Sequence, residues 1–376
     1  MDLDDTHPAL SDLAAHARKR VPHFIWEYLQ SATGDESSAR RSAEALDRIT
    51  LVPRNLRKVS PDLGTTFLGQ RFDLPFGIAP VGMSGSVWPG AEAMLARSAA
   101  RNGAPFSLST VAAMTPEAVG PHLGTGWFQL YAPGDPEIRR DMLKRARDAG
   151  FTGLILTVDV QTPSRRERQR RARLTNPMQF TPRILWQTAQ APFWALAIVQ
   201  NGVPKLRTLE KYAGDTKAKG ETTSHIGYML RTAPDWEYLA AVRDEWDGPL
   251  MVKGVLSAED AARATDLADA VWISNHGGRQ FEAAPAPVDV LPAIRQAVGP
   301  DYPLIADGAV RSGTDILRLI AKGADYVMLG RAFHHGAASF GERGVDHVFH
   351  ILREGLKADM GQLGISRPEE VRDHLG

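Results

Sequence analysis

Short apolar runs recur along the chain, and most of them end at glycine, proline or a polar residue. Runs that are apolar throughout are typical of strands buried on both faces of a parallel sheet. Eight such runs are 75–80, 104–110, 126–131, 153–160, 249–254, 270–275, 302–308 and 324–330. Helical patterns with capping residues lie between them at 90–103, 135–150, 257–268 and 313–323. This alternation predicts an α/β fold, a (β/α)8 TIM barrel, with a doubly wound open sheet as the alternative.

The chain is longer than a barrel requires. Such a barrel takes about 250 residues, and the chain has 376. The surplus forms an N-terminal helical extension, a long insert at about 162–234 after the fourth strand, and a helical tail. We expect one domain over 1–376, with the barrel at about 75–340. The insert joins an arginine-rich run (165–173) to an apolar, aromatic run (183–200), which is typical of a lid or of a segment that contacts a membrane or a partner.

Composition excludes several classes of function. The 44 basic and 44 acidic side chains balance, so nucleic acid is not an expected partner. The chain has no cysteine, which excludes disulfides, thiolate metal sites and a cysteine nucleophile. The acidic N-terminus does not resemble a secretory signal. The apolar run at 191–199 is far shorter than the roughly 18–20 residues of a membrane span. We expect a cytoplasmic protein, with peripheral contact at the inner membrane face left open.

Polar or small residues follow nearly every predicted strand. They occupy 79–82, 109–110, 129–131, 157–159, 253, 274–279, 307–313 and 330–331. Any one of them could be a helix cap or a satisfied core group. A whole ring of them at the carboxyl ends of barrel strands, where barrel enzymes carry their chemistry, indicates an active site.

Two of these strand ends favour phosphate. The stretches DGAVRSGTD (307–315) and GRAF (330–333) combine small residues with Arg311 and Arg331. Backbone N–H groups and arginine side chains together bind anions well. Lys253 ends the fifth strand in an apolar setting, which is costly unless it meets an anion or lies at the rim.

The stretch SNHGGRQ (274–280) places His276 and Arg279 three positions apart after a buried strand. Arginine binds a planar carboxylate with two parallel hydrogen bonds, and histidine can take a proton near neutral pH. The pair suits a substrate whose carboxylate lies beside an ionisable O–H or C–H. Asp159, which ends the fourth strand, could orient the imidazole.

These motifs, together with IAP (78–80), FQLY (128–131), TVD (157–159) and VKG (252–254), resemble the FMN-dependent α-hydroxy acid oxidase and dehydrogenase family over about residues 10–370. The family includes glycolate oxidase, flavin-linked L-lactate dehydrogenases and mandelate dehydrogenase. The insert most resembles that of the bacterial lactate and mandelate dehydrogenases.

The resemblance implies a role for each matching residue. His276 would be the base, paired with Asp159, and Tyr131 would belong to the same catalytic set. Arg166 and Arg279 would bind the substrate carboxylate, and Tyr28 and Tyr131 would bond to its carboxylate or hydroxyl. The residues implied to hold FMN are Ala79, Pro80, Val81, Ser109, Gln129, Thr157, Lys253, Ser274, Asp307, Gly308, Arg311, Gly330 and Arg331. No metal is implied.

Two departures from the family pattern bear on the substrate and on the turn after the seventh strand. Val111 stands where glycolate oxidase has a tryptophan, so we expect a larger or aromatic side chain on the substrate than that of glycolate. Ala309 stands where glycine is common, and we expect its φ to be negative.

The expected reaction is oxidation of an L-2-hydroxy acid to the 2-oxo acid, by hydride transfer or through a carbanion. We expect a dehydrogenase, with a quinone, a carrier protein or oxygen as acceptor, and a true oxidase as the alternative. The resemblance also implies a homotetramer. An FMN-dependent isomerase or a non-catalytic barrel are more distant alternatives.

Overall fold

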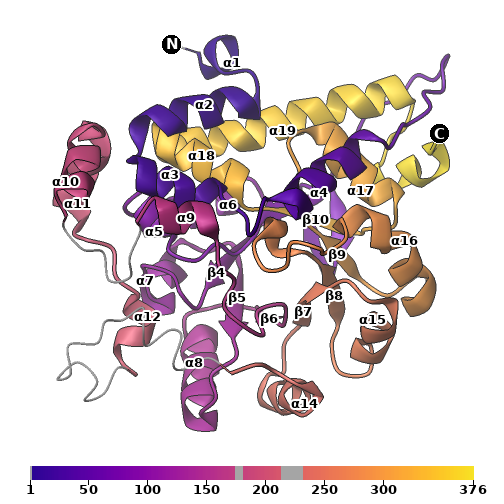
Figure 1. Cartoon of the computed structure of the whole chain (residues 1–376). Helices are drawn as coiled ribbons and strands as arrows, with labels where there is room; N and C mark the ends of the chain where they lie inside the picture. Colours follow the sequence, from indigo (N-terminus) through magenta and orange to yellow (C-terminus); the bar gives the residue numbers. More distant parts are fainter. Residues whose placement is uncertain (1, 174–180, 213–231) are drawn as a thin grey trace.

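Eight parallel strands close into a barrel in the computed structural model, which describes residues 2–173, 181–212 and 232–376 (Figure 1). Neighbouring strands follow the order of the chain, and the last strand pairs with the first to close the ring. This closure confirms the predicted (β/α)8 barrel and excludes the open sheet. The strands are β3 (Phe76–Ile78), β4 (Pro105–Ser109), β5 (Thr125–Tyr131), β6 (Gly153–Thr157), β7 (Leu250–Val255), β8 (Ala270–Ile273), β9 (Leu304–Ala306) and β10 (Tyr326–Leu329).

Helices follow the strands and cover the outside of the barrel (Figure 1). The four predicted helices are present as α6, α8, α15 and α17, and the side chains of Ser257 and Ser312 cap the last two as the pattern indicates. The helix after β4 has only four residues and continues into a 3-10 turn. The covering helices are α5 (Ser84–Val87), α6 (Ala91–Arg101), α7 (Pro116–Val119), α8 (Pro136–Asp148), α14 (Trp236–Glu245), α15 (Ala258–Ala264), α16 (Pro287–Val298), α17 (Gly313–Ala321), α18 (Arg331–Phe340) and α19 (Glu342–Leu363).

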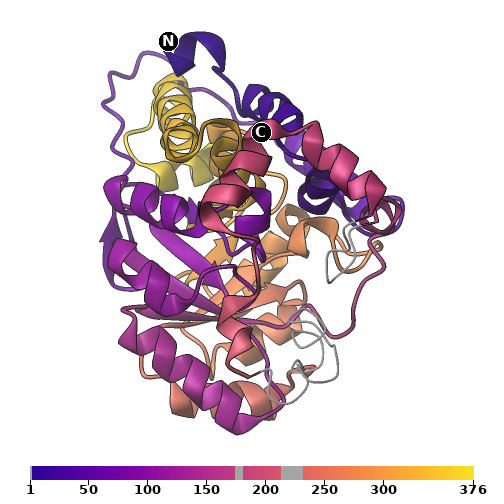
Figure 2. The same ribbon diagram turned by 90° about the vertical axis from the view of Figure 1, so that its left-hand side faces the viewer.

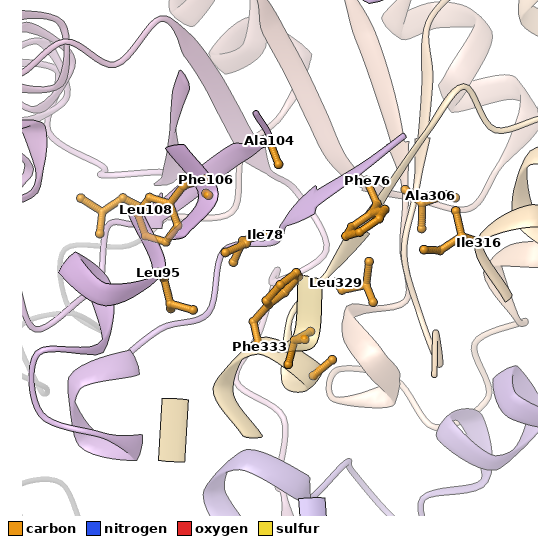
Figure 3. Packing of buried hydrophobic residues seen from close by; sticks show 14 of the residues in the cluster. Phe76, Ile78, Leu95, Ala104, Phe106, Leu108, Ala306, Ile316, Leu329 and Phe333 are labelled. Atoms are coloured by element: carbon orange, nitrogen blue, oxygen red, sulfur yellow. The ribbon is translucent and has the colours of Figure 1, made fainter. Parts of the chain in front are cut away.

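Alternate residues of each strand face opposite sides of the barrel wall. The outward set packs against the helices, as Figure 3 shows for Phe76 and Ile78 beside Phe333 of α18. The inward set forms a separate apolar cluster in which Trp127 and Trp272 are almost fully buried. A closed, filled barrel leaves only the inward residues at the strand ends available for chemistry.

The N-terminal extension contacts both ends of the barrel. Its helices are α1 (Leu3–Thr6), α2 (Leu10–Arg20), α3 (His23–Gln30) and α4 (Ser37–Asp47), followed by the hairpin of β1 (Thr65–Phe67) and β2 (Gln70–Phe72). Phe67 and Phe72 of this hairpin pack against the inward Trp127 and Tyr326, and so close the amino-terminal end. Helices α3 and α4 reach the carboxyl ends of the strands, as the contacts below show. A short 3-10 segment, Pro368–His374, ends the chain.

The insert after β6 contains α9 (Glu167–Arg171), α10 (Pro182–Ala189), α11 (Pro192–Asn201) and α12 (Arg207–Glu210). Helices α10 and α11 stand at the edge of the molecule and lie against the N-terminal helices (Figure 2). There the backbone N–H of Phe24 donates to Gln187, and the indole of Trp194 lies edge-on to the Phe24 ring. Among the residues that the structure describes, no helix combines the length and hydropathy needed to cross a bilayer.

Candidate active site

The predicted strand-end residues form a ring inside the barrel, at the carboxyl ends of the strands. Six of the eight follow an inward core residue by two positions, as Gln129 follows Trp127 and Lys253 follows Met251; Ala79 belongs to the inward cluster itself, and Ser109 bonds to Gln129. The strand period of two therefore turns these six inward as well. The ring consists of Ala79, Ser109, Gln129, Thr157, Lys253, Ser274, Asp307 and Gly330, and all but Gly330 are less than 10% exposed.

Lys253, Ser274 and Asp307 share a buried polar network. The Lys253 ammonium donates to the Ser274 hydroxyl at 2.8 Å and pairs with Asp307 at 3.2 Å. The Ser274 hydroxyl donates to the other Asp307 oxygen at 2.7 Å. The Trp272 indole N–H adds a bond to Asp307 at 2.9 Å. These partners allow a charged lysine to remain inside the barrel.

Gln129 has a buried amide that is only half satisfied. Its Oε1 accepts from the Ser109 hydroxyl at 2.7 Å. Its Nε2 has no hydrogen-bond partner among the residues that the structure describes. A buried donor without a partner costs about 1–3 kcal/mol, so this atom fits an acceptor on a bound group. With the Lys253 ammonium on the same inner layer, the ring presents donors to a planar, oxygen-bearing cofactor such as FMN.

A run of left-handed backbone explains the two glycines after His276. His276, Gly277 and Gly278 have φ values of 57°, 63° and 76°. A side chain at Gly278 would place its Cβ 2.7 Å from the Ala39 backbone nitrogen of α4. Positive φ is uncommon for residues other than glycine and is concentrated at functional sites. The backbone that ends β8 therefore turns sharply, and it carries His276 into the barrel mouth.

Asp159 orients the His276 ring. The Nδ1 atom of His276 lies 3.0 Å from one Asp159 oxygen and 3.2 Å from the other. A carboxylate only accepts, so Nδ1 carries the hydrogen and Nε2 keeps its lone pair. Burial lowers the pKa of His276, and the Asp159 charge opposes that change. Burial would raise the pKa of Asp159, but the interactions with His276, the charge of Lys253 and a backbone hydrogen bond together leave this pKa lowered. The pair is a neutral imidazole beside a carboxylate.

Arg279 is a buried cation at the same turn. Its guanidinium donates to the backbone carbonyls of Tyr28 and Ser31 and to no carboxylate among the described residues. Burial lowers the pKa of Arg279 to about 9, and the positive charge of Arg166 adds to the decrease. A cation in this position gains stability when an anion binds.

Arg166 and the two tyrosines surround the His276–Arg279 turn. The positive charge of Arg166 acts to lower the pKa values of His276, Arg279 and Arg331. The Nε of Arg166 donates to the Ser164 hydroxyl at 3.1 Å. The ring of Tyr28 lies under the Arg279 guanidinium at 5.2 Å, and its hydroxyl donates to the Gly82 carbonyl at 2.6 Å.

Tyr131 interacts electrostatically with Arg279, and its backbone N–H donates to Thr110. The structure thus brings the predicted base and the predicted carboxylate-binding residues to one place.

Val111 lies over the loop after β3. A Cβ added at Gly82 would be 2.7 Å from a Val111 methyl and 3.7 Å from the Tyr28 hydroxyl. In the same loop, Val81 lies against Gly330, where an added Cβ would be 3.0 Å from a Val81 methyl. Pro80 and Val81 are partly exposed at the barrel mouth.

The two predicted phosphate arginines lie apart from each other. The guanidinium of Arg331 donates to the carbonyls of Leu29 and Gly277, each at 3.1 Å, and so supports the turn after His276. Arg311 is about half exposed and pairs with Asp47 and Asp315. The structure does not bring the Arg311 side chain to the inner ring. A phosphate-binding role stays a prediction for both residues.

The expectation for Ala309 is wrong. Its φ is 59°, directly after Gly308 at 107°. The chain turns through two left-handed residues after β9, and an alanine in this conformation costs about 1–2 kcal/mol.

Sequence reasoning also missed Asn275. Its amide donates to Ser42 at 2.8 Å in α4 and accepts from the Gly278 N–H at 3.2 Å, which holds the turn in place. Its position inside SNHGGRQ was the available signal.

The comparisons with known proteins agree with this geometry. The model of the FMN-dependent dehydrogenase family matches residues 17–375. A monotopic membrane protein, (S)-mandelate dehydrogenase, is 33% identical with a TM-score of 0.92, and 98% of each chain is covered. A soluble mutant of the membrane-associated (S)-mandelate dehydrogenase from Pseudomonas putida is 33% identical with a TM-score of 0.85, covering 98% of this chain and 99% of that one.

A mandelate oxidase with benzoyl-formic acid is 30% identical with a TM-score of 0.82, and 98% of each chain is covered. Family model, full-length likeness and site geometry lead to one conclusion. The chain belongs to the family of FMN-dependent α-hydroxy acid oxidases and dehydrogenases, and FMN is its cofactor.

Proposed function

We propose that the chain oxidises (S)-2-hydroxy acids with a large or aromatic side chain, of which mandelate is the model, to the 2-oxo acids. The proposal rests on two groups of one turn, the buried Arg279 and the Nε2 of His276. Among the described residues, Arg279 has no carboxylate partner and His276 Nε2 has no hydrogen-bond partner. An L-2-hydroxy acid supplies both missing partners, a carboxylate for the cation and a proton for the imidazole.

Each residue of the site has a proposed task in this reaction. Arg279 and Arg166 bind the carboxylate, and the Tyr28 and Tyr131 hydroxyls direct the substrate. His276 Nε2 receives one proton, from the hydroxyl or from Cα, and Asp159 stabilises the imidazolium that forms. When bound, FMN supplies the two-electron acceptor. Lys253 contributes positive charge on the inner ring, where a buried charge acts strongly.

The substrate side chain is the part of the proposal that Val111 supports. A valine leaves more room than the indole found at this position in glycolate oxidase, and burial of apolar surface contributes about 25 cal/mol per Å2. We expect a higher kcat/KM for (S)-mandelate than for glycolate. Val111→Trp should reverse that order. Unchanged substrate preference in this variant would show that Val111 does not set the pocket.

We further propose a dehydrogenase rather than a true oxidase. The exposed apolar surface described below supports this choice, because a membrane position gives access to a quinone. Hydrogen peroxide measured per turnover in air tests it. A trace of peroxide is expected, and a stoichiometric yield would identify an oxidase.

Helices α10 and α11 carry the surface that we propose for membrane contact, which we call the insert apolar face. Its side chains are 43–81% exposed, and they are Leu185 and Trp186 of α10, Phe193, Leu196 and Val199 of α11, and Val203 just after α11. The opposite side of the same helices packs inward through Ile184 and Trp194. Arg20 lies over the Phe193 ring at 4.6 Å. Aromatic and aliphatic side chains beside cations suit the interface of an anionic bilayer.

Co-sedimentation with phosphatidylglycerol vesicles tests this surface. A variant with Trp186→Ser, Phe193→Ser and Leu196→Gln should lose most of its pelleting at low salt. Leu56→Gln, at an exposed leucine elsewhere, is the matched control and should pellet like the wild type. Equal, negligible pelleting of all three proteins would contradict membrane contact and leave a lid or a subunit interface.

The proposed assembly is a homotetramer, on the strength of the family resemblance. Light scattering on the purified holoenzyme should give four times the 41.0-kDa chain mass. A monomeric mass would contradict it.

A further inference from the structure

A buried carboxylate joins two loops at the barrel mouth. Glu92 lies in the first turn of α6 and is only 1% exposed. Its Oε1 atom accepts the backbone N–H of Gly85 at 3.0 Å and that of Ala113 at 2.8 Å. Its Oε2 atom has no partner in the described part of the chain. A single oxygen therefore holds the segment after β3 and the segment after β4.

These two segments touch along their length. The Met83 N–H donates to the Val111 carbonyl at 2.8 Å. An added Cβ at Gly85 would lie 2.6 Å from the Ala113 Cβ, and one at Gly82 would lie 2.7 Å from a Val111 methyl. The segment after β3 and the segment after β4 are closely packed, so a displacement of one segment displaces the other. Val111, the proposed wall of the substrate pocket, lies two residues before the Ala113 N–H that Glu92 holds.

The insert supports the second segment from another side. Thr208 of α12 is 1% exposed, and its hydroxyl donates to the Met114 carbonyl at 3.4 Å. Burial raises the pKa of Glu92, while its backbone hydrogen bonds and the charge of Arg207 of α12 oppose the rise. The contacts of Glu92 thus need an acceptor oxygen rather than a negative charge.

We propose that Glu92 is a positioning residue for selection of the substrate side chain. Its Oε1 fixes the spacing between the Gly82 segment and the Val111 segment, and so fixes the room beside Val111. The inference rests on the proposed role of Val111 as the pocket wall. Glu92 itself touches neither substrate nor cofactor in this account.

The test compares Glu92→Gln with Glu92→Leu in the holoenzyme. Glutamine keeps an acceptor at Oε1, whereas leucine leaves both backbone N–H groups without a partner. The readouts are the kcat/KM ratio of (S)-mandelate to L-lactate, and the Kd ratio of benzoylformate to pyruvate from flavin absorbance changes. We expect leucine to lower both preferences about tenfold, mainly through KM, since hydrophobic pockets discriminate by roughly 10–200-fold. We expect Glu92→Gln to keep both ratios close to the wild-type values.

A matched control separates positioning from stability. Glu245 holds Arg139 at 2.7 Å on the outside of the barrel, so Glu245→Leu should lower Tm and leave both ratios unchanged. Should Glu92→Leu not fold, Glu92→Asp withdraws the acceptor by one methylene and should shift the ratios in the same direction.

Unchanged ratios in folded Glu92→Leu, or in Glu92→Asp where the leucine variant does not fold, would overturn the inference. A Glu92→Gln variant as impaired as Glu92→Leu would overturn it as well. Failure of every 2-hydroxy acid to reduce the flavin would overturn the proposed function alone, because the Kd ratio still reports on Glu92.

Discussion

At the scale of single residues, the site depends on how each polar side chain is paired. Lys253 and Asp307 form a buried ion pair. Among the described residues, the hydrogen bonds of Arg279 go to backbone carbonyls, and Gln129 Nε2 has no partner. The paired groups stabilise the interior of the barrel, and the unpaired groups mark the positions where polar ligand atoms would bind. Strand-end position and side-chain chemistry were enough to predict these residues. The conformation of Ala309 was not predictable, because it depends on how the whole turn packs.

A pH profile tests the pairing of His276 with Asp159. The base acts when it is neutral, so flavin reduction should rise with pH through the lowered pKa of His276 and then level off. Asp159 opposes the lowering of that pKa. Asp159→Asn should therefore move the acid limb to lower pH, and it should reduce the plateau by about 10²–10⁴-fold because the imidazolium loses its stabilising charge. An acid limb at higher pH in the variant would contradict the assignment.

At the scale of elements, the turn after β8 and the N-terminal helices form one unit. Asn275 and Gly278 both contact α4, and Arg279 contacts the end of α3. The sequence pattern predicted the strand and the turn. It did not predict that α3 and α4 come to the barrel mouth, because contacts between segments more than 200 residues apart leave no local periodicity.

A pair of glycine variants tests the packing of this turn. Gly278→Ala adds a Cβ 2.7 Å from the Ala39 nitrogen at a φ of 76°. Overpacking and left-handed strain together should cost about 2–4 kcal/mol. Gly90→Ala is the control, since Gly90 is also left-handed, with a φ of 78°, but the atom nearest to its added Cβ is 3.6 Å away, and it should cost about 1 kcal/mol. Thermal unfolding should place Gly278→Ala clearly below the control, and equal Tm values would contradict the close contact with α4.

The insert is also tied to the N-terminal extension. Arg168 of α9 forms ion pairs with Glu27 at 2.7 Å and Glu36 at 2.8 Å. The run 165–173 contains six arginines, for which we expected contact with a membrane, a partner or the substrate. Arg168 instead forms an internal contact. Charge composition alone could not reveal which arginine would find buried carboxylates.

Loss of the ion pairs of Arg168 should weaken substrate binding. Arg168→Leu releases α9, whose N-cap residue is Arg166, from α3, which carries Tyr28. Misplacement of such groups should raise KM about tenfold. Arg170→Leu is the control, because Arg170 donates within the insert to the Arg165 carbonyl. Steady-state kinetics on both variants measures the difference, and an equal KM in the two would remove this role.

At the scale of the whole molecule, the two ends of the barrel differ. Apolar side chains fill the amino-terminal end, and hydrogen-bond donors line the carboxyl end of the strands. The hairpin of β1 and β2 closes one end with aromatic side chains, and the ring of strand-end residues faces the other. The folding pattern and this polarity were predictable from the apolar runs. The orientation of the insert helices was not, because an apolar helix can bury either face.

Removal of FMN tests how much the cofactor stabilises this arrangement. The Gln129 Nε2 donor, which has no partner among the described residues, should make the apo protein less stable than the holoenzyme. Added FMN at 100 times its Kd should contribute about 2.7 kcal/mol, seen as a higher Tm. A Tm that does not change with FMN concentration would contradict a cofactor held by this ring.

The most direct test of the account is the rate of flavin reduction in His276→Gln. The variant loses the free imidazole Nε2 but keeps the ring of strand-end residues, so it should be isolated with FMN and its yellow colour. In anaerobic stopped flow with (S)-mandelate, its reduction rate should fall by at least about 10²–10⁴-fold. His23→Gln, at an exposed histidine of α3, should reduce normally. Reduction of the His276→Gln flavin at nearly the wild-type rate would contradict the assignment of His276 as the base.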